Sequence, residues 1–200
     1  GYDPYSNSKS CSELVTHSYK RCFFDEKSDI AVSTMRAGNV IGGGDVSRDR
    51  IIPDCVRSAS KGERILVRNP YSIRPYQHVL EPVKAYMMVA RAQYENKSLA
   101  GYYNVGPDEC DCVTTGELTD LFCQQWGEGL SWKNVSVEGP HEANFLKLDC
   151  SKIKSRLQWQ PRWHIEDALR ETVVWAKAYQ KGEEIAKVME EQIREFLRRA

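Results

Sequence analysis

The sequence predicts an α/β fold. Short segments rich in β-branched and aromatic residues alternate with longer segments whose apolar residues recur every three or four positions, a pattern typical of strands alternating with amphipathic helices. Beyond residue 165 the pattern is helical only. The 200-residue chain is 41% hydrophobic and contains five Trp, so it can bury a core and we do not expect it to be disordered.

The N-terminal part predicts a helix, a strand and a turn. Apolar residues recur at helical spacing over residues 8–24, and Asp3 and Pro4 just upstream suit a helix start. Residues 30–36 are rich in β-branched side chains and bounded by charge and glycine, which predicts a strand. The three glycines at 42–44 then predict a flexible turn.

The remaining elements follow from the same two periodicities. Thr114 or Thr115 suits a helix cap, with Glu117 completing a partial capping box, and Asp149 suits the N-cap of a later helix. We expect short strands at 64–67, 101–105 and 132–137. We expect helices at 51–61, 81–95, 115–126, 149–157, 165–179 and 185–197.

Composition limits the partners and the cell compartment. Lys plus Arg and Asp plus Glu each number 28, so nothing favours a nucleic-acid or membrane-surface partner. We see no membrane-spanning run and no signal peptide, and therefore expect a cytoplasmic protein. Seven irregularly spaced Cys predict reduced thiols rather than a disulfide framework. Cys110 and Cys112 lack a second pair or a well-spaced His, so we expect no metal site.

Tyr5 and Lys9 form the strongest local candidate for catalysis. Four residues apart on a helix, they lie on the same face, one turn from each other. A tyrosine hydroxyl ordinarily titrates near ~10, so it acts as a base near neutrality only where a fixed cation favours the phenolate. The spacing alone is also typical of an ordinary solvated helix face.

Four later sequence blocks strengthen the case that Tyr5 and Lys9 are catalytic. The chain resembles the extended short-chain dehydrogenase/reductase family over residues 5–161, about four-fifths of its length. The blocks that carry the resemblance are YSNSKSCSE (5–13), RAGNVIG (36–42), RPYQHV (74–79), YNVG (103–106) and LDCSKIKSRLQWQP (148–161).

Within that family, the segments RAGNVIGGGD, DRIIPD, RPYQHVLEP and PHEANFLKLD look most like members that dehydrate CDP-glucose. The resemblance implies a lyase with bound NAD that converts the nucleotide sugar CDP-glucose to CDP-4-keto-6-deoxyglucose, a step of deoxysugar and surface polysaccharide biosynthesis. It also implies a homodimer of the full-length protein through the Tyr5 helix, with which the apolar face Cys11–Phe23 is compatible.

The resemblance also assigns roles to single residues. Tyr5 would be the base, Lys9 its electrostatic partner and a ligand of the nicotinamide ribose, and both would contact NAD. Arg36 and Asn39 would lie beside the nicotinamide, with Asn39 also reaching the sugar diphosphate. For Asn39, a turn-forming role before the glycines is the alternative.

Further substrate contacts are implied along the chain. Arg74 would pair with the diphosphate, for which a planar guanidinium is suited, although a surface ion pair is the common alternative. Asn104 would lie near the nucleotide or cap a turn. Arg50, Ile51 and Ile52 belong to a segment that would pack on the nucleotide, with the backbone of Ile51 and Ile52 in contact with it. The remaining candidates are His78, which would line the site, and His141, in a nucleotide-side loop.

We expect the chain to be the C-terminal part of a Rossmann-like, doubly wound parallel sheet plus a small α/β substrate-binding lobe. Residues 1–41 would belong to the dinucleotide-binding domain, and 42–200 mainly to the lobe, with 79–106 returning to the first domain. The glycines at 42–44 would be the hinge. We see no glycine-rich dinucleotide fingerprint, and we expect a chain beginning at Tyr5 to lack upstream acid and base residues and to be inactive alone.

Two other functions share these observations. A nucleotide-sugar 4-epimerase or reductase would use the same Tyr5 and Lys9, and upstream residues would distinguish it from a dehydratase. A non-catalytic remnant or interaction scaffold is the alternative from a different class. The intact Tyr5, Lys9, Asn39 and Arg74 count against it.

Overall fold

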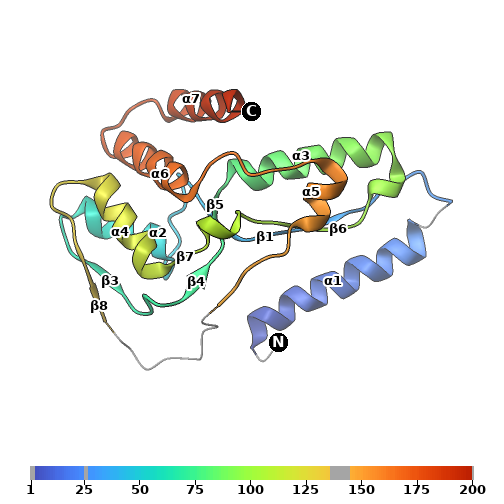
Figure 1. Cartoon of the computed structure of the whole chain (residues 1–200), viewed down its shortest axis with the longest axis horizontal. Helices are drawn as coiled ribbons and strands as arrows, with labels where there is room; N and C mark the ends of the chain where they lie inside the picture. Colours follow the sequence, from blue (N-terminus) through green and yellow to red (C-terminus); the bar gives the residue numbers. More distant parts are fainter. Residues whose placement is uncertain (1–2, 25–26, 136–144, 200) are drawn as a thin grey trace.

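The computed structural model describes residues 3–24, 27–135 and 145–199 (Figure 1). Its helices are α1 (Pro4–Phe23), α2 (Ile51–Ser60), α3 (Leu80–Glu95), α4 (Thr115–Trp126), α5 (Ser151–Leu157), α6 (Ile165–Gln180) and α7 (Ile185–Arg198), with short 3₁₀ turns at Lys97–Leu99 and Glu109–Asp111. Its strands are β1 (Thr34–Ala37), β2 (Asn39–Ile41), β3 (Ile65–Val67), β4 (Ile73–Arg74), β5 (Tyr76–His78), β6 (Tyr102–Val105), β7 (Val113–Thr114) and β8 (Trp132–Asn134).

The strands pair two by two. β1 pairs with β6, β2 with β5, and β3 with β8, all in parallel, whereas β4 and β7 are antiparallel. Gly38 lies between β1 and β2, where the chain changes partner from β6 to β5. A Cβ at Gly38 would lie 2.5 Å from the Pro75 carbonyl oxygen, so only glycine allows the two backbones to approach this closely.

The described residues form two separate hydrophobic cores. The first lies among α2, α4, α6 and neighbouring strands, and contains Phe122 and Leu169, both fully buried. The second lies between α3, α5 and β6, around Tyr103 and Trp159. Figure 1 shows α1 on one side of β1 and β6, with α3 and α5 on the other. None of the described helices is long and apolar enough to cross a membrane.

The predicted helices are all present, and the local signals explain their ends. Asp3 caps α1, its carboxylate accepting from the Ser6 N–H at 2.9 Å. Thr114 and Glu117 form a complete capping box at α4. The predicted N-cap at Asp149 is wrong by one residue: the cap position is Cys150, although the Asp149 carboxylate accepts from the Ser151 N–H at 2.9 Å.

The strands are less well predicted. The strand expected at 30–36 begins only at Thr34, because pairing with β6 starts there. β2, β4, β5 and β7, of two or three residues each, were not predicted. Segments this short show no alternation of apolar and polar residues, and their pairing with distant segments decides their conformation.

The glycines at 42–44 are a packed turn rather than a flexible one. A Cβ on Gly43 would lie 2.1 Å from Cγ of Trp175, so the α6 indole occupies the space of a side chain. Trp175 in turn stacks on Tyr179 with ring centroids 5.2 Å apart. Gly43 is therefore needed for contact with the first core, which the sequence alone does not show.

Candidate functional site

Tyr5 and Lys9 lie on the first two turns of α1, as predicted. The Lys9 ammonium is 5.2 Å from the centroid of the Tyr5 ring. Tyr5 is 71% exposed, and Lys9 is exposed as well. The Asp3 cap fixes the start of this helix, and its hydrogen bonds from Ser6 lower the pKa of the Asp3 carboxyl. The two side chains can therefore reach a ligand placed over this end of α1.

Arg36 is engaged by a residue of α1. Its Nε lies 2.7 Å from Oε1 of Glu13 and its Nη2 2.9 Å from Oε2, which is a bidentate pair. The hydrogen bonds from Arg36 lower the pKa of the Glu13 carboxyl, and the same pairing raises the pKa of Arg36. The guanidinium predicted to lie by the nicotinamide thus joins α1 to β1, a role that the sequence did not reveal.

Asn104 lies next to Arg36 in the parallel β1–β6 pair. Nη1 of Arg36 is 3.4 Å from Oδ1 of Asn104, and Nδ2 of Asn104 donates to the Asp149 carbonyl at 3.0 Å. The structure therefore brings two predicted site residues, Arg36 and Asn104, into one hydrogen-bond network. This network connects α1, β1, β6 and the segment before α5.

Asn39 opens β2, directly after the change of strand partner at Gly38. Its backbone N–H donates to the Pro75 carbonyl at 2.9 Å, which makes it a strand residue rather than a turn former. The neighbouring Gln77 is 2% exposed and donates from Nε2 to the Val105 carbonyl at 2.9 Å, linking β5 to β6. Within the described residues the Gln77 Oε1 atom is buried without a hydrogen-bond partner.

The predicted diphosphate and nucleotide contacts differ in exposure. Arg74 on β4 is 8% exposed and donates to the Ile73 carbonyl at 3.0 Å. Arg50 precedes α2 and pairs with Asp45 at 3.4 Å. The side chain of Ile52 belongs to the first core and that of Ile51 packs against it.

His78 is packed inside the protein. Only 3% exposed, its ring meets that of Trp163 edge-on, with centroids 4.8 Å apart. Its Nδ1 accepts from the Leu80 N–H at 3.3 Å, and burial lowers the pKa of His78 to about 4. The imidazole is therefore neutral and serves packing at the start of α3. His141 lies outside the described residues.

Glu81 is a buried carboxyl that the sequence did not single out. Its Oε1 accepts from the backbone N–H groups of Arg162 and Trp163 at 2.7 and 2.8 Å, while burial raises its pKa. It fastens the loop before α6 to α3. An acidic residue in a first helical turn is ordinary, so the sequence offers no signal for this role.

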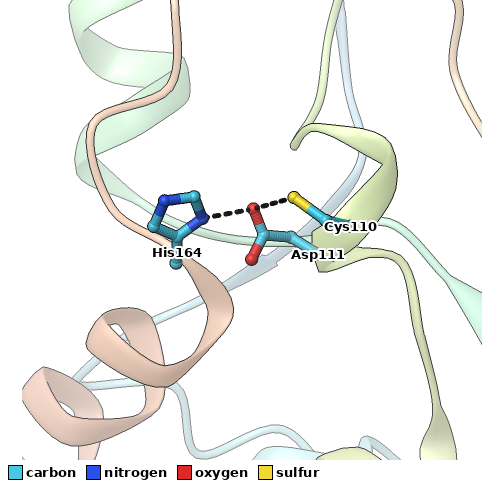
Figure 2. A group of neighbouring side chains, drawn as sticks. All are labelled: Cys110, Asp111 and His164. Atoms are coloured by element: carbon cyan, nitrogen blue, oxygen red, sulfur yellow. Dashed lines mark hydrogen bonds and ion pairs between the residues drawn. The ribbon is translucent and has the colours of Figure 1, made fainter.

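Cys110, Asp111 and His164 bring three possible metal ligands together (Figure 2). Both oxygens of the buried Asp111 are already used: Oδ1 accepts from the Ile165 N–H at 3.0 Å, and Oδ2 lies 2.9 Å from Nδ1 of His164. This carboxylate raises the pKa of His164 and also that of the Cys110 thiol, which opposes thiolate formation. The cluster is explained as a cap on α6.

The chain is similar to known nucleotide-sugar 4,6-dehydratases. A protein-family model described as GDP-mannose 4,6 dehydratase matches residues 1–172. The chain is 43% identical, over 98% of its length, to CDP-glucose 4,6-dehydratase of Salmonella typhimurium, and 26% identical, over 86%, to dTDP-glucose 4,6-dehydratase of Haemophilus influenzae. It covers 56% and 51% of these two proteins, so it spans about half the length of the curated relatives it matches.

Solved structures confirm the predicted α/β fold class. The fold is similar to dTDP-glucose 4,6-dehydratase from Bacillus anthracis in complex with NAD, with a TM-score of 0.71 at 19% identity over 90% of this chain and 54% of that one. It is also similar to UDP-glucuronic acid 4-epimerase from Bacillus cereus, with a TM-score of 0.74 at 17% identity over 88% of this chain and 53% of that one. By sequence and by fold, the chain belongs to the GDP-mannose 4,6 dehydratase family.

Proposed function

We propose that the protein containing this chain is an NAD-dependent dehydratase that converts CDP-glucose to CDP-4-keto-6-deoxyglucose. The observation that carries the proposal is the 43% identity to a CDP-glucose 4,6-dehydratase over 98% of the chain, including an intact Tyr5–Lys9 pair. Two further relatives, which act on UDP-glucose and dTDP-glucose, are only 27% and 26% identical, which favours cytidine over uridine and thymidine as the base.

Tyr5 and Lys9 carry the first step of the proposed reaction. The Tyr5 oxygen, exposed at the start of α1, takes the proton of the sugar 4-hydroxyl as that carbon is oxidised to a ketone. The Lys9 ammonium, 5.2 Å from the centroid of the Tyr5 ring, is the proposed electrostatic partner of Tyr5 in this step. The ketone then acidifies the C5 hydrogen, and water leaves across C5 and C6.

The residues of α1 fit NAD as the cofactor. Within the described part of the chain Lys9 has no carboxylate partner, so its three donors can bind ribose hydroxyls. Arg36 fits less well, because Glu13 occupies its guanidinium. When bound, NAD would accept the hydride from C4 and return it to C6. Asn39, Arg74, Asn104 and the backbone at Arg50–Ile52 remain the proposed substrate contacts.

The two cores support the proposed domains. Met35 on β1, Val89 on α3 and Tyr103 on β6 share the second core, as expected if residues 79–106 return to the dinucleotide-binding domain of residues 1–41. The second core also includes Ile153 and Trp159, so we extend that domain to α5. The first core would then be the centre of the substrate-binding lobe.

We further propose that the protein is a cytoplasmic homodimer in a deoxysugar pathway. The apolar side chains of α1 support a helix-mediated dimer, because Leu14, Val15, Tyr19 and Phe23 are all more than half exposed. Light scattering of the complete protein tests this proposal: a dimer mass that Leu14→Glu reduces to that of the monomer supports it, and a monomer mass at every concentration contradicts it.

Product analysis of the complete protein tests the activity. CDP-glucose, dTDP-glucose and UDP-glucose are each incubated with enzyme and NAD, and the products are identified by NMR. We expect a 4-keto-6-deoxy sugar from CDP-glucose, with little turnover of the other two. Formation of CDP-galactose would instead assign the protein as a 4-epimerase. No turnover of CDP-glucose would refute the proposal.

A further inference from the structure

We infer that the Glu13–Arg36 ion pair is a positioning device for Tyr5 and Lys9. It fixes the register of α1 against the sheet and, at the same time, keeps the Glu13 carboxylate away from the Lys9 ammonium. The inference rests on the proposed function in taking Tyr5 and Lys9 as the reacting pair.

The spacing along α1 creates the need for such a device. Tyr5, Lys9 and Glu13 follow at four-residue intervals in one helix, so all three lie along the same face. A Lys and a Glu four residues apart attract each other on a helix surface. Lys9 therefore has two neighbours one turn away: the Tyr5 hydroxyl that it is proposed to assist, and a carboxylate that competes for it.

Arg36 resolves this competition in the structure. Its Nε and Nη2 engage both oxygens of Glu13, at 2.7 and 2.9 Å, so a bidentate ion pair holds the carboxylate against β1. Its Nη1 reaches Asn104 at 3.4 Å, which orients the guanidinium from the other side. The Lys9 ammonium lies instead over the Tyr5 ring, 5.2 Å from its centroid.

Within the described residues, polar contacts attach α1 to the rest of the chain. None of the residues of α1 is buried. Besides Glu13, the helix is attached through His17, whose Nδ1 is 3.1 Å from the Tyr102 hydroxyl, and through Lys20, which donates to the Val32 carbonyl at 2.9 Å. Of these contacts, the Glu13 pair is nearest to Lys9 in sequence and the only bidentate one.

The inference predicts an unusual order of activities. Arg36→Met frees the Glu13 carboxylate to pair with Lys9, so this variant loses both the register of α1 and the Tyr5–Lys9 contact. Glu13→Gln removes the carboxylate that competes with Tyr5 for Lys9, and keeps a side-chain oxygen that accepts a hydrogen bond from Arg36. The double variant Glu13→Gln/Arg36→Met removes the competitor as well, and should therefore be more active than Arg36→Met.

The test measures kcat and KM for CDP-glucose in the complete protein. We expect Arg36→Met to lower kcat about tenfold with KM within about twofold, and the second substitution to restore part of that loss, because α1 still lacks its attachment to β1. The control is Arg91→Met, which breaks an exposed pair with Glu95 on α3 (2.9 Å) and should leave kcat unchanged. A double variant no more active than Arg36→Met overturns the inference.

A second measurement needs no turnover and separates this inference from the proposed function. Hydrogen exchange of residues 4–23, followed by mass spectrometry on substrate-free protein, should be faster in Arg36→Met than in wild type and unchanged in Arg91→Met. If wild type does not dehydrate CDP-glucose, the proposed function fails and exchange still decides on the positioning of α1. Unchanged exchange in Arg36→Met overturns the inference whatever the substrate is.

Discussion

Acidification should destabilise this protein through His78. The side chain is 3% exposed, and burial lowers its pKa from 6.5 to about 4. Because the folded pKa is the lower one, the unfolded chain binds the proton more readily between these two values. Stability is therefore lost as the pH falls from 6.5 towards 4. This sign is opposite to that of a histidine paired with a carboxylate.

The magnitude follows from the two pKa values. At pH 5 the unfolded imidazole is almost fully protonated, whereas the folded one is still mostly neutral. The interval between the unfolded pKa of 6.5 and pH 5 then corresponds to about 2 kcal/mol of unfolding free energy lost relative to neutral pH. Glu81 opposes this in part, because its raised pKa adds stability as the pH falls. A comparison with a variant is therefore needed to isolate His78.

Urea unfolding followed by Trp fluorescence, at pH 7 and pH 5, provides that comparison. His78→Asn keeps an acceptor for the Leu80 N–H and lacks the titrating group. We expect wild type to lose about 2 kcal/mol more than His78→Asn between the two pH values. His164→Asn is the matched control: Asp111 raises the pKa of His164, so that variant should lose more stability than wild type on acidification. Equal losses in wild type and His78→Asn would refute the reasoning.

Three further predictions follow from single contacts. Gly43→Ala should lower the unfolding free energy by about 1–3 kcal/mol because its Cβ would overlap the Trp175 ring. Gly101→Ala should cost less, because the nearest atom to its Cβ would be the end of the flexible Lys152 side chain at 3.1 Å; equal losses in urea would contradict this. Thr114→Ala should cost about 1 kcal/mol through loss of the α4 capping box, seen as a lower Tm, and an unchanged Tm would count against it. Asp111→Asn should lower the pKa of His164 in an NMR titration, because the Asp111 hydrogen bond is the main cause of its raised value; an unchanged pKa would assign that shift elsewhere.

The sequence predicts the helices of this fold well because their signals are local. The periodicity of α6, the Asp3 cap and the Thr114–Glu117 capping box are each determined by residues only a few positions apart in the sequence. Strands such as β4 and β5 depend instead on distant partners: Ile73 pairs with Thr114, and Tyr76 with Asn39. No window of sequence around them contains that information.

The candidate site shows the same division. The Tyr5–Lys9 contact was predicted because one helical turn determines it. The engagement of Arg36 by Glu13 was not predicted, since those residues are 23 positions apart and meet only when α1 lies beside β1. Gly43 was misread for a similar reason, because the contact that requires a glycine comes from Trp175 on α6.

Transfer of an isotope from C4 to C6 of the sugar tests the central claim most directly. The complete protein is incubated with NAD and CDP-glucose deuterated at C4, and the product is examined by NMR and mass spectrometry. We expect one deuterium at C6 of a 4-keto-6-deoxy product in wild type, and a large loss of turnover in Tyr5→Phe. Deuterium retained at C4, or full turnover by Tyr5→Phe, would contradict the assignment of Tyr5 as the base of a 4,6-dehydratase.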